Sequence, residues 1–265
     1  MPLNYNRTYL GSKEDTEPWL RIFLIKWLFR SSMQVSKIQA YLTKFPAWLE
    51  TEEALALLPL WETQQNWQTH FNVEAKDLAA SYDRALDSKT NRRHYRRGGY
   101  DPKRAMLKLM EWEPDFVREA FRDLFSEDRQ LEGRIQRFVF YVNELFNRFR
   151  DERPKDKTPS HNHDDDYNMI SLYLMGQYPE VYAPYSTALL LLVCTRLGAK
   201  EVPPAADFPR YTKLLKTLRN FLEKDEAVME AYQQTLREQD YQGPSALLVW
   251  WWFKMIEADD SGDAE

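Results

Sequence analysis

Apolar residues recur at helical spacing along most of this chain. In the stretch from Glu113 to Phe125, Pro114 stands at the first helical position and an apolar stripe follows on one side. The same period predicts helices over residues 17–44, 73–86, 103–112, 131–150, 167–177, 188–197, 211–222 and 225–236. Residues 46–61 predict one or two more, broken at Pro46 and Pro59. We therefore expect a mainly α fold, a multi-helix array of amphipathic helices with little or no β-sheet.

One apolar run near the end of the chain has no clear period. Residues 246–256 read ALLVWWWFKMI, which suits a buried strand or a helix, and we favour the helix. Four consecutive aromatic residues, from Trp250 to Phe253, cannot share one face of a helix. We expect the run to pack in the core or against a following domain, with some rings needing an outside partner. A stacking platform for bases or an aromatic cage is the alternative.

Composition agrees with a helical fold. Aromatic residues make up 14% of the 265 residues against only eight glycines, so large side chains rather than turns dominate. The single cysteine, Cys194, excludes an intramolecular disulfide and a cysteine zinc cage, and its apolar neighbours predict core packing. No apolar run reaches the ~20 residues that cross a bilayer. With no signal-peptide layout at the start, we expect a cytoplasmic protein without a membrane partner.

Charge is distributed unevenly. The net charge of −5 by itself argues against nucleic-acid binding. Residues 84–104, however, hold eight lysines or arginines and two acids, so this segment carries +6 and the rest of the chain −11. Such a concentration repels itself unless an anion neutralises it, and phosphate is the commonest such anion. The segment is therefore the first place to look for a ligand.

The centre of this segment is the run RRHYRR, which has no apolar period and predicts a loop. Arginine binds phosphate bidentately, and the neighbouring tyrosines offer faces on which bases can stack. The candidate nucleic-acid-binding residues are Arg92, Arg93, His94, Tyr95, Arg96, Arg97, Tyr100, Lys103 and Arg104. Two other interpretations remain open: a solvated loop paired with the protein's own acids, and a contact to another protein.

These patterns divide the chain into four parts. Residues 1–90 form an N-terminal helical subdomain, 91–101 the basic loop, 102–256 a second helical domain, and 257–265 an acidic linker or tail. Within the second domain, residues 151–166 are highly charged, contain two prolines and lack apolar residues. We expect them to form an exposed loop or hinge.

That loop ends in HNHDDD, whose residue types bind metals. The simpler interpretation is capping, in which Asp165 or Asp166 accepts hydrogen bonds from the first amides of the helix that follows. A recognition surface and a metal site on His161, His163 and Asp164 remain as alternatives, although a metal needs rigidly held further ligands. We expect no metal and no cofactor.

Two phrases carry a family resemblance: EPDFVREAFRDLF, from Glu113, and HNHDDDYNMISLYLMGQYPEVYAP, from His161. They resemble the N-terminal region of McrB-like restriction proteins, over residues 103–253. In that family a helical module that selects DNA precedes an AAA+ motor that hydrolyses GTP, and a McrC-like nuclease subunit acts with it. The resemblance implies DNA, modified or unmodified, as the ligand, and that motor and nuclease as partners in phage defence.

Catalytic constellations are scarce. No G-x-x-x-x-G-K-[ST] phosphate loop occurs, so a nucleotide-hydrolysing motor does not reside on this chain. The fragment EAK at residues 74–76 has the E-x-K spacing of metal-dependent nucleases but no partner aspartate on a preceding strand. We expect a non-catalytic nucleic-acid recognition module. The alternatives are a protein-interaction or scaffold domain and, on weaker grounds, a metal-dependent hydrolase.

Overall fold

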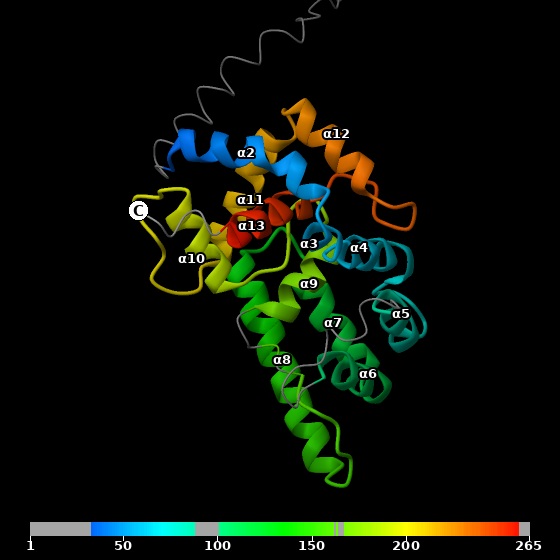
Figure 1. Ribbon diagram of the computed structural model, residues 1–265. Coiled ribbons are helices and arrows are strands. Elements are labelled where there is room, and N and C mark those ends of the chain that lie inside the picture. The colour runs from blue at the N-terminus through cyan, green and yellow to red at the C-terminus, as the bar shows by residue number, and fades with distance from the viewer. Residues whose placement is uncertain (1–32, 88–100, 162, 164–166, 260–265) are drawn as a thin grey trace, which may run out of the picture.

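The computed structural model describes residues 33–87, 101–161, 163 and 167–259 (Figure 1). Throughout these ranges the regular structure is helical and no strand is present, which confirms the mainly α prediction. None of the described helices combines the length and the apolar character that a bilayer crossing requires.

Most predicted helices are present, with shifted ends, but residues 17–32 of the helix predicted over 17–44 lie outside the described part of the chain. The N-terminal part contains α2 (Val35–Leu49), α3 (Glu52–Leu55), α4 (Pro59–His70) and α5 (Leu78–Ala85). The part from residue 101 onward contains α6 (Pro102–Trp112), α7 (Pro114–Leu124), α8 (Leu131–Glu152), α9 (Asn168–Gln177), α10 (Thr187–Arg196), α11 (Phe208–Leu222), α12 (Glu226–Thr235) and α13 (Leu247–Ala258).

Local chemistry explains where several helices begin. Four aspartates accept a hydrogen bond from the backbone amide three residues later and so cap α5, α6, α11 and α12; they are Asp77, Asp101, Asp207 and Asp225. Asp77 also corrects the predicted helix over residues 73–86, because the helix begins only after this cap, at Leu78. Prolines occupy the first turn of α4, α6, α7 and α11, where their missing N–H costs nothing.

The predicted break at Pro46 is wrong. α2 continues through this proline to Leu49. Pro46 has no N–H to donate to the carbonyl four residues earlier, so the helix loses one hydrogen bond. Phe45 and Leu49 are fully buried on either side of it. We attribute the unbroken helix to this packing, which outweighs the lost bond.

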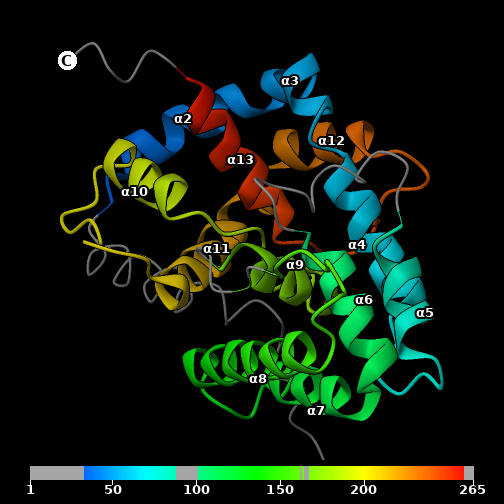
Figure 2. The same cartoon turned by 90° about the horizontal axis from the view of Figure 1, so that it is seen from below.

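Helices from both ends of the chain pack against one another. α2 contacts α12 and α13, α4 contacts α9, and α5 contacts α6. Figure 1 and Figure 2 show α6, α7 and α8 together at one end of the molecule, away from α2 and α12. The lower part of α8 projects beyond the other helices in Figure 1.

α13 lies at the centre of the other half, between α2, α10 and α11. It confirms the preference for a helix over residues 246–256. Trp251, Trp252 and Phe253 have no exposed surface and Trp250 is 8% exposed. The expectation that some of these rings need an outside partner is therefore wrong, because this chain's own residues bury all four.

The start of the predicted acidic tail is also part of the fold. α13 runs through Ala258, and the Asp259 carboxylate forms an ion pair with Lys44 on α2 at 2.6 Å. An Arg196 nitrogen (Nη1) donates to the Asp259 carbonyl at 2.7 Å. Residues 257–259 are thus anchored to α2 and α10, and residues 260–265 lie outside the described part of the chain.

Candidate nucleic-acid interface

Most of the predicted basic site lies outside the residues that the structure describes. Lys103 and Arg104, in the first turn of α6, are the two candidate residues that the structure places. The other seven lie in residues 88–100, which the structure does not describe: Arg92, Arg93, His94, Tyr95, Arg96, Arg97 and Tyr100. What the structure shows is how the described end of this segment is held.

Asp101 connects that end to another part of the molecule. Its carboxylate accepts a hydrogen bond from the Arg104 amide at 3.1 Å and caps α6. Its own backbone amide donates to the Ser160 carbonyl at 3.1 Å. Ser160 ends the connection after α8, residues 153–160, which we call the α8 loop. The described end of the basic segment therefore lies against the α8 loop.

The two described candidates differ in their partners. The Lys103 ammonium forms an ion pair with the Asp83 carboxylate on α5 at 2.7 Å and donates to the Asp83 carbonyl at 3.0 Å. For Lys103, this ion pair agrees with the alternative interpretation, in which the protein's own acids neutralise the basic segment. Arg104 is exposed and has no ion-pair partner among the described residues. Only Arg104 is thus ready to bind an external anion.

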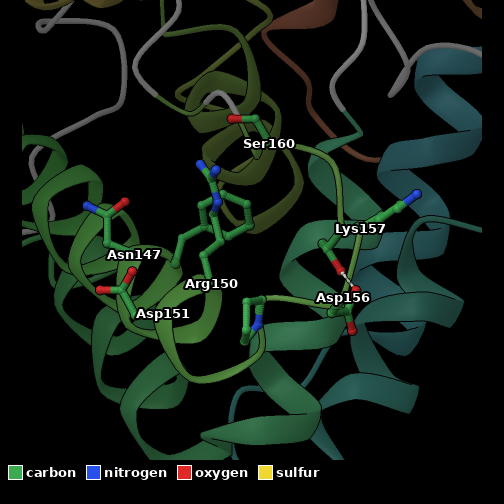
Figure 3. A pocket seen from close by; sticks show the side chains of 9 residues that line it. Asn147, Arg150, Asp151, Asp156, Lys157 and Ser160 are labelled. Carbon is green, nitrogen blue, oxygen red and sulfur yellow. Dashed lines mark hydrogen bonds between the residues drawn. The ribbon is translucent and has the colours of Figure 1, made fainter.

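The α8 loop and the end of α8 enclose an open pocket of about 830 Å³. Phe146, Pro154 and a ring of polar groups line it. In Figure 3 the Arg150 guanidinium points toward Ser160, while the Lys157 amine points away from Arg150. The two cations therefore offer separate contacts on the two sides of the α8 loop.

Three cations in this region have no ion-pair partner among the described residues: Arg150, Lys155 and Lys157, all of them exposed. Elsewhere cations are commonly paired; Arg122 binds Glu74 and Arg137 binds Asp123. An unpaired cation retains its full capacity to bind an anion, whereas a paired one must first exchange its carboxylate. We call Arg104, Arg150, Lys155 and Lys157 the basic edge.

Acidic groups reduce this positive charge without cancelling it. Asp151 and Asp156 also line the pocket, and Asp156 accepts a hydrogen bond from the Thr158 hydroxyl at 2.6 Å. Residues 147–160 contain five lysines or arginines and three acids, so their net charge is +2. Two more of these cations, Arg148 and Arg153, lie over the Trp112 ring at 5.3 and 5.8 Å from its centroid.

The predicted loop over residues 151–166 needs two corrections. Residues 151 and 152 are the last turn of α8, and residues 153–157 are exposed as expected. His161 and His163, however, are 3% and 1% exposed. Flanking charges suggested a solvated segment, but the rings pack against Phe146 and Phe138 of α8. The histidines are core residues.

A hydrogen-bonded chain runs inward from these rings. The two Nδ1 atoms of His161 and His163 are 2.8 Å apart, His163 Nε2 is 2.8 Å from the Tyr173 hydroxyl, and that hydroxyl is 2.7 Å from the Tyr82 hydroxyl. Burial holds the pKa of His163 well below its ordinary value, and His161 adds to this effect. His163 is therefore neutral at pH 7.

Of the three roles considered for the HNHDDD stretch, the described residues show neither the cap nor the metal site. Among the described residues no group of three or more His, Cys, Asp or Glu side chains could hold a metal ion. The capping candidates Asp165 and Asp166, and Asp164 of the metal alternative, lie outside the description. α9 begins at Asn168, after Tyr167, whose φ of 55° is left-handed and whose side chain makes no cap.

Two smaller predictions concern single residues. Cys194 is fully buried, as expected, and desolvation raises the pKa of its thiol. Glu74 of the EAK fragment binds Arg122 through a hydrogen bond of 2.8 Å, which lowers the pKa of the carboxyl. Both side chains therefore have structural roles in the described fold.

The sequence analysis missed one surface. Phe116 of α7 and Phe140 of α8 are 36% and 58% exposed, and both rings contact Tyr141 edge-on. A hint was available, since Phe140 follows Phe138 by two positions and the two cannot both face the core. We call these three residues the aromatic patch.

No family model, curated protein or solved structure matches this chain.

Proposed function

We propose that this chain is a non-catalytic recognition module that binds nucleic acid through its phosphates. The observation that carries the proposal is the hydrogen bond between Asp101 and Ser160, which joins two positively charged segments that are far apart in the sequence. Residues 84–104 contribute a net charge of +6 and residues 147–160 a net charge of +2. Phosphate binding by both segments would neutralise more charge than binding by either segment alone.

The state of the charges supports this function. Arg150, Lys155 and Lys157 are exposed and have no ion-pair partner among the described residues, although the rest of the chain carries a large excess of acid. Nearby, the Trp112 ring is half-buried beneath two guanidinium groups. Cations beside aromatic rings are typical of surfaces that bind a phosphate backbone and stack on bases.

The resemblance to McrB-like proteins gives this proposal a setting. In that setting the module selects DNA, modified or unmodified, for an AAA+ motor and a McrC-like nuclease subunit in the cytoplasm. The chain itself then needs no catalytic group, and it contains no phosphate-loop motif. Incubated with DNA, GTP or ATP and a divalent metal, the purified chain should neither cut DNA nor release phosphate.

Fluorescence anisotropy with a labelled DNA duplex, measured over a range of salt concentrations, tests the proposal. Log affinity should fall linearly with log salt, and each phosphate contact removed should reduce the slope by about 0.9. The first variant replaces the arginines of the basic run with alanine at positions Arg92, Arg93, Arg96 and Arg97. The second replaces the unpaired cations of the α8 end, at Arg150, Lys155 and Lys157.

A control matched to the second variant has the same change in charge elsewhere. It replaces three exposed lysines outside the basic edge, Lys37, Lys76 and Lys224, with alanine. We expect both site variants to lose affinity for all sequences alike and the control to lose much less. Equal losses would indicate that only net charge matters. Absence of DNA binding by the unaltered chain at low salt would refute the proposal.

A protein-interaction or scaffold domain is the second candidate, and the aromatic patch is the observation that favours it. Exposed rings of this size are typical of protein contacts. Binding centred on them should depend little on salt, in contrast to binding through phosphates. Phe140→Ala should then weaken partner binding while DNA binding stays unchanged.

A further inference from the structure

A second pocket lies at the opposite end of α8 from the basic edge. It has a volume of about 780 Å³ and is formed by the segment before α8, the first turn of α8, the connection after α9, and α11. Since α8 has 22 residues, it spans about 33 Å, which separates the two pockets. The second pocket is thus spatially separate from the basic edge.

The first feature of this pocket is an uncapped helix start. Gln130, Leu131 and Glu132 line it, and the Gln130 side chain accepts no hydrogen bond from the first amides of α8. These amides and the helix dipole concentrate partial positive charge at this point. An anion placed there accepts hydrogen bonds that the protein leaves open.

The second feature is a buried arginine. Arg134 lines the same pocket and is 3% exposed. Its Nη atoms donate to the Leu124 carbonyl at 3.1 Å and to the Tyr182 hydroxyl at 3.0 Å, both neutral acceptors. Its nearest carboxylate, Glu127, is 3.8 Å away, and its Nε has no hydrogen-bond partner. A buried charge so weakly compensated favours an additional anion.

The third feature is the charge on the facing helix. Lys213 and Lys216 of α11 line the pocket, are exposed and have no ion-pair partner among the described residues. The acids that line it are Glu127, Asp128, Glu132 and Glu180. Glu180 forms an ion pair with Arg219, whereas Glu127 and Asp128 accept hydrogen bonds from the neutral Tyr182 and Ser126 hydroxyls and keep their negative charge. Glu132 has no hydrogen-bond or ion-pair partner among the described residues and, with Glu127 and Asp128, opposes an incoming anion.

From these three features we infer that the pocket binds a phosphate group between the start of α8, Arg134, Lys213 and Lys216. Two lysines, a buried guanidinium and free helix amides suit a dianion better than a single carboxylate. The volume exceeds that of one ion and falls in the range of small-molecule sites, about 300–1,000 Å³. The phosphate therefore belongs to a larger molecule, either a phosphorylated metabolite or a nucleic acid.

Titration calorimetry and thermal unfolding with inorganic phosphate test the inference at constant ionic strength, with chloride as the reference anion. The heat of phosphate binding should approach a plateau as phosphate is added, and phosphate should raise the unfolding temperature of the protein. The double variant Lys213→Ala/Lys216→Ala changes only exposed side chains and should weaken phosphate binding at least about tenfold. Glu132→Gln should strengthen it, because it removes one of the opposing charges. Lys224→Ala, just after α11, is the control and should bind as the unaltered protein does.

Two further binding measurements identify the molecule to which the phosphate belongs. If a nucleoside monophosphate binds more tightly than inorganic phosphate and the double variant retains full DNA affinity, the ligand is a small molecule. If the double variant also loses DNA affinity, with a smaller salt slope, the ligand is a backbone phosphate. No difference between phosphate and chloride, or unchanged phosphate binding by the double variant, would overturn the inference. Neither result bears on DNA binding at the basic edge.

Discussion

α13 and α8 are both rich in aromatic residues, yet they have opposite surroundings. α13 is apolar on nearly every face and is enclosed by α2, α10 and α11. α8 buries one stripe, which includes Phe138, Phe146 and Phe149, and exposes Phe140 and the cations near its end. The difference shows that aromatic content alone does not mark a binding surface. The rings that are candidates for recognition are the few that packing leaves exposed.

The largest expected effect is in α13. The centroids of the Trp251 and Trp61 rings are 4.4 Å apart, and Trp251 Nε1 donates a hydrogen bond to the Ala54 carbonyl at 3.1 Å. Trp251→Ala removes this packing and orphans the carbonyl, so we expect a loss of about 3–5 kcal/mol in the free energy of unfolding. Urea denaturation at pH 7 measures it. A loss below about 1 kcal/mol would mean that α13 is not the centre of this half.

The second effect concerns two glycines in helices. A Cβ at Gly176 of α9 would lie 2.5 Å from the Trp67 ring, whereas at Gly133 of α8 it would lie 3.3 Å from the flexible Arg137 guanidinium. Alanine gains ~1 kcal/mol of intrinsic helix preference at either site. At Gly176 the clash should dominate and cost about 1–3 kcal/mol net.

Gly133→Ala is the matched control for this pair. It should be neutral or stabilising by up to ~1 kcal/mol, because the guanidinium can move aside. Differential scanning calorimetry of both variants gives the comparison. If Gly176→Ala were as stable as Gly133→Ala, the close packing of α9 on α4 would be contradicted.

The third effect is a pH dependence of folding. The folded pKa of His163 is well below its ordinary value of 6.5, because the ring is buried. Above pH 6.5 both states are neutral and the stability is at its maximum. As the pH falls from 6.5 toward the folded pKa, the unfolded chain binds a proton that the folded protein excludes. Stability should therefore fall by up to about 1.4 kcal/mol per pH unit from this residue.

His163→Gln isolates this contribution. The variant should be less stable at pH 7, since it loses the hydrogen bond to the Tyr173 hydroxyl, but its stability should fall less steeply between pH 6.5 and 5. Urea denaturation at several pH values measures both slopes. Identical slopes would assign the pH dependence to other groups.

The smallest effect is on the exposed side of α8. Phe140 is 58% exposed, so Phe140→Ala should change the free energy of unfolding by no more than about 0.5 kcal/mol. Urea denaturation of this variant and of Trp251→Ala compares an exposed aromatic residue with a buried one. A loss above about 2 kcal/mol would place Phe140 in a packed environment and remove the basis for the aromatic patch.

The sequence by itself determined which segments are helical, because that information is local. The signals act within one or two helical turns. They are a proline in the first turn, an aspartate that caps the helix through the amide three residues later, and apolar residues at helical spacing. They located α6, α7, α8 and α11 to within a few residues. The sequence likewise predicted that Cys194 is buried and marked the +6 segment as the candidate site.

Only the tertiary structure decided which polar residues are buried and which charges are left unpaired. Hydrogen bonds join His163 to Tyr173, Tyr173 to Tyr82 and Asp101 to Ser160, which are 10, 91 and 59 positions apart and which no periodic pattern relates. α2 passes through Pro46, and α13 finds cover for four adjacent rings, because helices distant in the sequence pack around them. A buried arginine facing two unpaired lysines likewise exists only after α8 and α11 come together. Local patterns specify the helices, and the contacts between helices specify the sites.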